Sequence, residues 1–277
     1  MGLIAGQGRL PFAVARGARA AGMRVVCVGL RGQADPALKG EVDRFSWGGV
    51  ARPGRWIRVL RRHGARETIM VGRVAKTRIY TPWRILQYLP DWRAFRIWYG
   101  RMRGRDRRND TLLCALADEL ATGGIILADS TRYCRDDLAG EGVMGKVEPS
   151  ASVRRDIEFG WGIVKEMGRL DIGQAIAVKE REVIAVEAIE GTDRMIERAG
   201  GLCRSGGWTL IKVAKPGQDK RFDVPTVGRE TLENLERHGG RCVAVEAGAV
   251  LMVEKEEVLR LADRLGIAVV GVAGRER

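Results

Sequence analysis

Gly2-Leu-Ile-Ala-Gly-Gln-Gly-Arg-Leu-Pro11 opens the chain with a short apolar run, a glycine-rich turn and a proline. Proline suits the first turn of a helix and Gly22 suits its end, so residues 11–21 are predicted to be helical. The apolar residues within 24–30 predict the next strand. A strand, a helix and a second strand in this order favour a parallel βαβ unit.

The same rhythm continues through the amino-terminal half. Further elements are predicted as a helix over 55–62, a strand over 68–71, a helix over 110–120 and a strand over 124–128. Alternating strands and helices of this kind build a parallel sheet with helices on its faces. We therefore predict an α/β fold class, with a Rossmann-like parallel α/β domain over residues 1–140.

Beyond a linker at 141–149 the pattern changes. Ser152 is predicted to cap a helix that runs to about Met167. Two hairpins are expected, one from strands 175–178 and 183–186, the other from strands 241–246 and 250–253 with a turn at Ala247-Gly248. Residues 141–277 should then form a carboxyl-terminal α+β domain with a mixed sheet, which would carry the catalytic site.

Composition sets the class of protein. The 277 residues are 45% hydrophobic, enough for a buried core, and no run approaches the roughly 18 apolar residues of a spanning helix. The first residues lack the basic and apolar regions of a leader peptide, so a cytoplasmic protein is expected. The five cysteines are far apart and form no CxxC pair, which favours buried free thiols over disulfides or structural zinc.

Basic residues are concentrated in one region. Residues 51–110 hold 17 Lys and Arg against 4 Asp and Glu, interleaved with tryptophans and tyrosines. Anionic lipid headgroups fit this combination, and so does a solvated arginine-rich surface. Nucleic acid fits less well, because no groove-reading motif accompanies the charge.

Three polar blocks lie beside apolar, strand-like runs in the second half. They read Gly168-Arg-Leu-Asp-Ile-Gly-Gln174, Glu190-Gly-Thr-Asp193 and Phe222-Asp-Val-Pro-Thr-Val-Gly228. Glycine lets backbone approach a ligand closely, and short polar side chains at strand ends can converge on one point. These blocks predict a polar site built on loops.

If the chain is an enzyme, carboxylates must do the chemistry, because it has only two histidines. Both, His63 and His238, precede a glycine at a predicted helix end, where a cap accounts for them. A Ser-His-Asp triad or a histidine-rich metal site is therefore not expected. The candidate carboxylates and their neutral partners are Asp171, Glu187, Asp193, Asp223, Gln174, Thr192 and Thr226.

Such oxygen ligands suit Mg²⁺ or another divalent cation, which binds one or two carboxylates together with water and substrate phosphates. Lys212 and Lys215 are placed to neutralise a pyrophosphate. Each carboxylate could instead have a purely structural role. Asp223 could cap a turn, Asp193 could cap a helix starting near Arg194, and Glu187 could form a salt bridge at a sheet edge.

Gly6, Gln7 and Gly8 form a glycine turn ahead of a helix, where an anion such as phosphate binds well. The dinucleotide fingerprint is incomplete, because its third glycine would fall on Pro11. The alternative is a tight strand-to-helix turn without a ligand.

Together with residues 2–11, Asp110-Thr-Leu-Leu113 and Gly266-Ile-Ala-Val-Val-Gly-Val272, the three blocks resemble the metal-dependent UDP-2,3-diacylglucosamine pyrophosphatases of lipid A biosynthesis, the LpxI type. The resemblance spans nearly the whole chain. It implies hydrolysis of a lipid-linked UDP-sugar to UMP and 2,3-diacylglucosamine 1-phosphate (lipid X), with Mg²⁺ and attack of water on the sugar-side phosphorus. The substrate would lie between the two domains.

The resemblance also suggests a role for each candidate. Asp223 falls on the aspartate most clearly required for hydrolysis and is expected to be catalytic. The expected metal ligands are Asp193, Asp223 and Glu187. The expected substrate-binding residues are Gly6, Gln7, Gly8, Asp171, Gln174, Thr192, Lys212, Lys215 and Thr226.

The stretch from Tyr80 to Arg108 departs from the family in being more basic and aromatic, and we expect it to dock the diacyl substrate or the inner leaflet. Expected partners are this substrate, the inner face of the inner membrane and a second copy in a homodimer, without nucleic acid. Two alternatives remain: a nucleotide-binding oxidoreductase, suggested by the glycine turn, and a non-enzymatic protein that binds anionic lipid or nucleic acid, suggested by the basic region.

Overall fold

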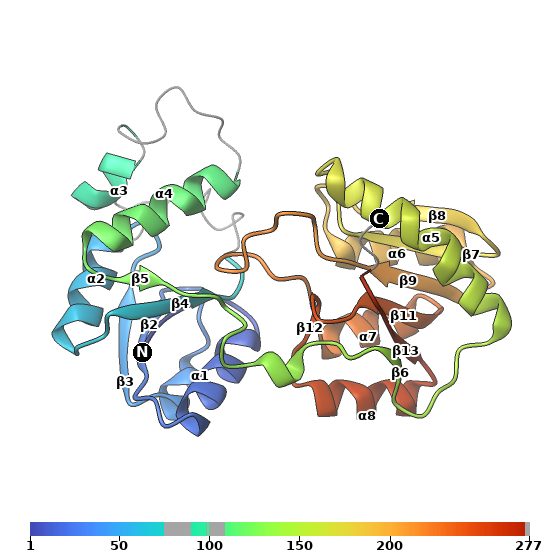
Figure 1. The fold of residues 1–277 in the computed structure, drawn as a ribbon, viewed down its shortest axis with the longest axis horizontal. Coiled ribbons are helices and arrows are strands. Elements are labelled where there is room, and N and C mark those ends of the chain that lie inside the picture. The colour runs from blue at the N-terminus through green and yellow to red at the C-terminus, as the bar shows by residue number, and fades with distance from the viewer. Residues whose placement is uncertain (75–89, 98, 100–108, 275–277) are drawn as a thin grey trace. The chain divides into compact units, whose positions relative to one another are not determined.

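The computed structural model describes residues 1–74, 90–97, 99 and 109–274 (Figure 1). The chain forms two compact units. The first contains Met1–Cys134 together with Lys220–Phe222, and the second contains Arg135–Asp219 and Asp223–Arg277. Each unit has its own sheet and its own hydrophobic core.

The first unit is built on a parallel sheet. In spatial order its strands are β3 (Arg44–Gly48), β2 (Val26–Leu30), β1 (Gly2–Ala5), β4 (Glu67–Val71) and β5 (Ile126–Leu127). The predicted parallel α/β architecture is therefore confirmed. The order of the strands reverses direction between β1 and β4, and the carboxyl ends of strands at such a switch point are where α/β folds bind ligands.

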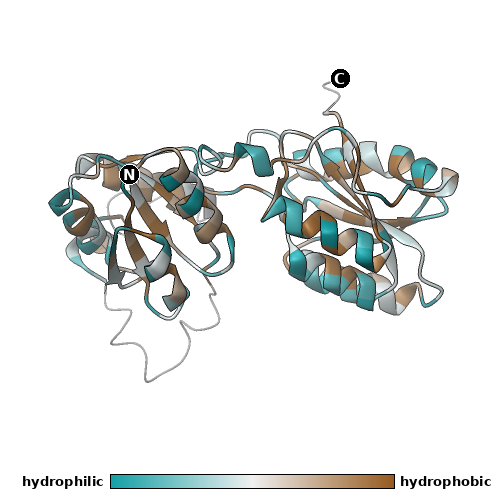
Figure 2. Cartoon of the chain, turned by 90° about the horizontal axis from the view of Figure 1, so that it is seen from below, coloured by the Kyte–Doolittle hydropathy of each residue, from teal (hydrophilic) through white to brown (hydrophobic). Residues whose placement is uncertain are grey.

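Local signals explain the first helices. The helical elements of this unit are α1 (Leu10–Ala20), η1 (Pro36–Glu41), α2 (Pro53–Arg62), α3 (Trp92–Arg96) and α4 (Asn109–Thr122). Proline begins α1, and Gly22 ends it with a φ of +74°, as the sequence predicts. Ile4 packs with Trp56 and Leu60 of α2 in one core cluster. Figure 2 shows hydrophobic strands and hydrophilic outer helix faces.

The second unit is built on a mixed sheet, also as expected. Its strands, in spatial order, are β6 (Gly142–Met144), β13 (Ala268–Val272), β11 (Gly240–Glu246), β9 (Trp208–Lys212), β7 (Ala175–Lys179) and β8 (Glu182–Val186). β9, β11 and β13 run parallel, and the other three join antiparallel. Short strands β10 (Thr226–Val227) and β12 (Leu251–Met252) pair separately, in parallel.

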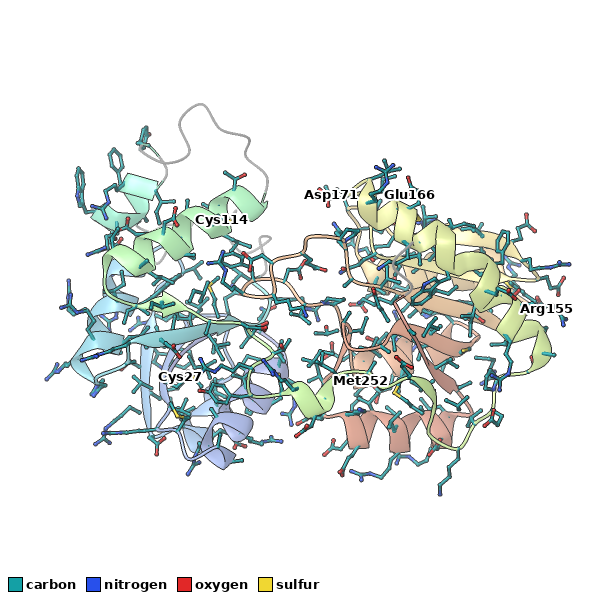
Figure 3. The ribbon with its side chains drawn as sticks, viewed as in Figure 1. Cys27, Cys114, Arg155, Glu166, Asp171 and Met252 are labelled. Carbon is teal, nitrogen blue, oxygen red and sulfur yellow. The ribbon has the colours of Figure 1, made fainter. Side chains whose placement is uncertain are left out.

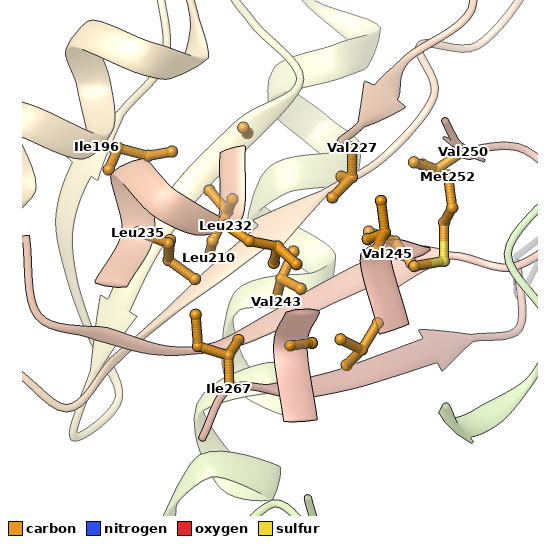
Figure 4. Packing of buried hydrophobic residues seen from close by; sticks show 14 of the residues in the cluster. Ile196, Leu210, Val227, Leu232, Leu235, Val243, Val245, Val250, Met252 and Ile267 are labelled. Carbon is orange, nitrogen blue, oxygen red and sulfur yellow. The ribbon is translucent and has the colours of Figure 1, made fainter. Parts of the chain in front are cut away.

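Helices cover both faces of this sheet. They are α5 (Ala151–Arg169), α6 (Thr192–Leu202), α7 (Arg229–Arg237) and α8 (Lys255–Leu265), while the short η5 (Arg135–Asp137) buries no residue. Ile157 and Val164 of α5 pack on one face, against Ile211. On the other face the remaining helices enclose Leu210 and Val243, as Figure 4 shows. Burying both faces leaves the loops at the ends of the strands as the places for polar chemistry.

Two details of the second unit differ from the sequence prediction. The expected hairpin of residues 241–246 with 250–253 is wrong, because β11 pairs in parallel with β9 and β13 while β12 pairs with β10. The cap of α5 is Ser150 rather than Ser152, and its hydroxyl accepts from the Val153 amide at 3.3 Å. The predicted hairpin of β7 and β8 is confirmed.

The remaining predictions have mixed outcomes. Three cysteines are buried, and burial raises the pKa of the Cys27 and Cys242 thiols to about 12, but Cys114 is exposed. His63 and His238 do stand at the ends of α2 and α7. In the described part of the chain no helix is both long and apolar enough to cross a bilayer. Most of the stretch from residue 80 to residue 108 lies outside the described residues.

Candidate active site

The polar blocks lie at one end of the strands of the second unit's sheet. β9 and β11 are parallel, so Lys212 and Glu246 stand at the carboxyl ends of neighbouring strands. β7 is antiparallel to both its neighbours, so the chain enters β7 and leaves β8 at this same end of the sheet. Residues 171–174, 187–192 and 213–225 therefore emerge together, at the carboxyl ends of the parallel strands.

A buried network joins five of the predicted site residues. The Thr192 hydroxyl donates to Glu187 Oε1 at 2.9 Å, and the backbone N–H of Gln174 donates to Glu187 Oε2 at 3.3 Å. Lys212 Nζ donates to the Thr192 hydroxyl at 3.1 Å and to the Thr226 carbonyl at 2.9 Å. Since Glu187 and Lys212 are both buried, the hydroxyl between them links two opposite charges that would be costly to bury alone.

Gly173 makes this network possible. A Cβ added to Gly173 would lie 2.0 Å from the Glu187 carbonyl oxygen, so only glycine lets the two loops approach this closely. The next residue, Gln174, keeps its side-chain oxygen buried, and that oxygen has no hydrogen-bond partner among the described residues. Buried acceptors are almost always satisfied, so a donor or cation belonging to a ligand suits this position.

A second, more exposed group contains Asp223. Lys215 Nζ donates to Asp171 Oδ1 at 2.6 Å, and the Lys215 amide donates to Gln218 Oε1 at 3.0 Å. Gln218 Nε2 in turn donates to Asp223 Oδ2 at 2.6 Å. Asp171 follows α5, near Glu166 in Figure 3, and has a positive φ of 57°. An ammonium group and an oriented carboxylate thus share one loop cluster.

Asp193 and the amino-terminal glycine turn have other hydrogen bonds of their own. Asp193 is exposed in the first turn of α6, whose cap is Gly191, and its backbone carbonyl accepts from Asn234 Nδ2 at 2.9 Å. Gly6, Gln7 and Gly8 belong to the first unit.

In that unit Gln7 pairs with Arg73 through two backbone hydrogen bonds of 2.8 and 3.1 Å. A Cβ on Gly6 would lie 2.7 Å from the carbonyl oxygens of Gly72 and Arg73. Backbone packing between the ends of β1 and β4 thus accounts for Gly6. The positive φ of Gly8, 97°, suits the turn into α1.

Two site residues escaped the sequence prediction. Gln218 orients Asp223, and its only sequence signal is an amide within the loop. Glu246 is buried at the end of β11 and accepts from Lys165 Nζ and from the Ala214 amide, both at 2.9 Å. The sequence does contain a sign of Glu246, because Val243-Ala-Val-Glu246 is an apolar run followed by glutamate. The run before Glu187 has the same pattern.

The fit to a divalent cation differs between the carboxylates. Both Glu187 oxygens accept from protein donors and the Lys212 ammonium lies one residue away in the network, an arrangement that suits an anchor of the loops. Asp223 is exposed and suits a ligand, in a shell completed by substrate phosphates and water. Among the described residues, no three His, Cys, Asp or Glu side chains come together as a preformed cage.

Comparison with known proteins covers both units. The family model of the LpxI N-terminal domain matches residues 1–136, and that of the LpxI C-terminal domain matches residues 140–270. A relative from Caulobacter vibrioides, UDP-2,3-diacylglucosamine pyrophosphatase LpxI, is 33% identical over 286 residues, which cover 100% of this chain and 99% of the relative. The chain therefore belongs to the LpxI family.

Proposed function

We propose that this protein hydrolyses the pyrophosphate bond of UDP-2,3-diacylglucosamine, giving UMP and 2,3-diacylglucosamine 1-phosphate. The full-length similarity to the Caulobacter pyrophosphatase is the observation that carries the proposal. The loop cluster supports it, because pyrophosphate hydrolysis needs cationic groups on the phosphates and an oriented acceptor for water. Neither family match supports the alternatives of an oxidoreductase or a non-enzymatic binding protein.

In the proposed reaction a water oxygen forms a bond to the sugar-side phosphorus, and the anhydride P–O bond to UMP breaks. Asp223 orients this water or accepts its proton, with its carboxylate held by Gln218. Lys215 neutralises charge on the phosphates, and Gln174 offers its buried oxygen to the substrate. Asp223, Lys215 and Gln174 stand on loops at the carboxyl ends of the parallel strands.

Mg²⁺, when bound, would polarise the phosphoryl oxygens and neutralise the charge that builds on the leaving phosphate. We assign Asp223 as its protein ligand, with Asp193 as the second candidate. Glu187 takes a different role in this proposal: with Thr192, Lys212 and Thr226 it holds the loops in register. The substrate is a lipid, so we further propose that the enzyme works at the cytoplasmic face of the inner membrane.

The test is product analysis with purified protein. UDP-2,3-diacylglucosamine in detergent is incubated with protein and Mg²⁺, and the nucleotide product is separated by chromatography. We expect UMP in equimolar amount with 2,3-diacylglucosamine 1-phosphate, and we expect EDTA to stop its release. Release of UDP, or no release by folded protein, would reject the reaction. Equal release of UMP with and without EDTA would reject the requirement for a metal but not the reaction.

A further inference from the structure

Three aromatic side chains form an exposed stack at the edge of the first unit. Trp92 and Phe95 of α3 stack with ring centroids 5.5 Å apart, and Phe95 stacks on Tyr99 at 4.3 Å. Their exposed fractions are 74%, 43% and 59%. The spacings of three and four residues place them on one side of a helical turn. Contiguous exposed aromatic surface of this kind marks an interaction site.

Both arginines of the same helix pair with a buried carboxylate of α4. Arg93 donates to Glu119 Oε1 at 2.6 Å, and Arg96 Nε donates to Glu119 Oε2 at 3.1 Å. The Glu119 side chain is fully buried. Burial raises the pKa of this carboxyl group, but the hydrogen bonds from Arg96 and Arg93 outweigh burial, so the pKa lies below its ordinary value. The rings of α3 are thus exposed, while its two arginines are held by ion pairs with Glu119.

The start of α3 is fixed as well. Asp91 caps the helix by accepting from the Ala94 amide at 3.0 Å, and its other oxygen accepts from the Gly54 amide of α2 at 2.8 Å. The aromatic stack is therefore held in place at two points on α2 and α4. A rigid apolar surface loses little conformational entropy when it binds.

The neighbouring helix also carries exposed positive charge. α2 packs beside α3 and exposes Arg58, Arg61 and Arg62. Residues 51–110 as a whole hold 17 Lys and Arg against 4 Asp and Glu. Tryptophan and tyrosine concentrate at the membrane interface, and arginine is attracted to anionic headgroups. Nucleic acid fits less well, because no groove-reading motif accompanies the charge.

We propose that Trp92, Phe95 and Tyr99, with the exposed arginines of α2, form a surface that binds anionic phospholipid bilayers. The rings insert at the level of the headgroups, and the arginines contact the phosphates. This inference rests on the proposed function only for its purpose, which is to bring the enzyme to a membrane-embedded substrate. The contacts that support it are independent of the reaction.

The test is sedimentation with vesicles of mixed phosphatidylglycerol and phosphatidylcholine, compared with phosphatidylcholine alone. The wild type should bind the anionic vesicles and release in high salt. Trp92→Ala/Phe95→Ala should weaken binding by about tenfold or more, because it removes most of the inserting apolar surface. Phe159→Ala is the matched control, since Phe159 is 40% exposed in the other unit, and it should bind like the wild type.

A second variant tests the charge: Arg61→Ala/Arg62→Ala should reduce binding to anionic vesicles while retaining the fold by circular dichroism. Equal binding by wild type and the aromatic double variant would overturn the proposal. The proposal would also be overturned if the wild type bound neither kind of vesicle. It would be overturned as well if the wild type were a dimer and the aromatic double variant a monomer, because the stack would then be a dimer interface. Turnover of detergent-dispersed substrate should survive in the double variant, so loss of lipid binding is separable from loss of the reaction.

Discussion

Gln218 holds the carboxylate of Asp223 in place. The amide donates to Asp223 at 2.6 Å while its oxygen accepts from the Lys215 backbone, so the side chain is held at both ends. Gln218→Leu keeps the size of the side chain but removes both hydrogen bonds. We expect kcat to fall about tenfold to a hundredfold with little change in KM, because misplacing a reacting group has costs of this order. Steady-state kinetics would show it, and an unchanged kcat would contradict the orienting role.

Glu187 and Lys212 are expected to stabilise the protein as a pair of buried opposite charges. If they anchor the loops as an ion pair bridged by Thr192, removing one charge leaves the other buried and uncompensated. Glu187→Leu or Lys212→Met alone should lower the free energy of unfolding by about 3–5 kcal/mol.

The double variant Glu187→Leu/Lys212→Met should be less destabilised than the sum of the two, by about 1–3 kcal/mol. Urea unfolding followed by circular dichroism measures all four proteins. Additive losses would mean that the two side chains do not act as a pair.

Among the secondary-structure elements, replacing two glycines by alanine should change the unfolding free energy in opposite directions. Gly173→Ala should cost more than about 3 kcal/mol of unfolding free energy, because its Cβ would meet backbone at 2.0 Å and force the loops apart. Gly162→Ala lies within α5 with nothing within 4 Å, so it should stabilise the protein by about 0.5–1 kcal/mol. Thermal unfolding compares them, and a stable Gly173→Ala protein would argue against the close approach to Glu187.

Local signals account for the elements that the sequence predicted well. Pro11 and Gly22 mark the ends of α1 within the chain itself, and the hairpin of β7 and β8 forms between neighbours in sequence. The expected hairpin of β11 and β12 failed because the partners of these strands are distant: Leu251 pairs with Thr226, and Val243 pairs with Leu210 and Val269. Turn residues alone cannot reveal such pairing.

The site shows the same division. Glu187, Thr192 and Lys212 could be predicted as polar residues at strand ends, and the structure joins them. Their mutual hydrogen bonds could not be predicted, because they need the register of three strands. Gln218 escaped for a similar reason: nothing in the sequence marks which loop amide reaches Asp223.

At the scale of the whole molecule, the chain crosses between its two units next to Asp223. Lys220–Phe222 belongs to the first unit, while Asp219 and Asp223 belong to the second. Within the first unit the Ser130 amide and hydroxyl donate to the Lys220 carbonyl at 3.0 and 2.7 Å, and Phe222 packs against the core. The three residues directly before Asp223 therefore belong to the first unit.

Ser130→Ala removes one of these two hydrogen bonds. We expect a loss of about 1 kcal/mol in unfolding free energy, and a fall of about tenfold in kcat because the loop holds Asp223 less firmly. Ser150→Ala is the control: it deletes the cap of α5 at a similar cost of about 1 kcal/mol but should leave kcat unchanged. Equal kcat values in the two variants would show that the hydrogen bonds from Ser130 to Lys220 do not serve the reaction.

In the proposed reaction Asp223 performs the chemistry of pyrophosphate hydrolysis. The most direct measurement takes Asp223→Ala and records substrate binding by calorimetry alongside UMP release. We predict binding close to that of the wild type and turnover reduced by at least about 10³-fold, because the group that orients or deprotonates water is gone. Turnover within about tenfold of the wild type would contradict the claim and place the reaction on another carboxylate.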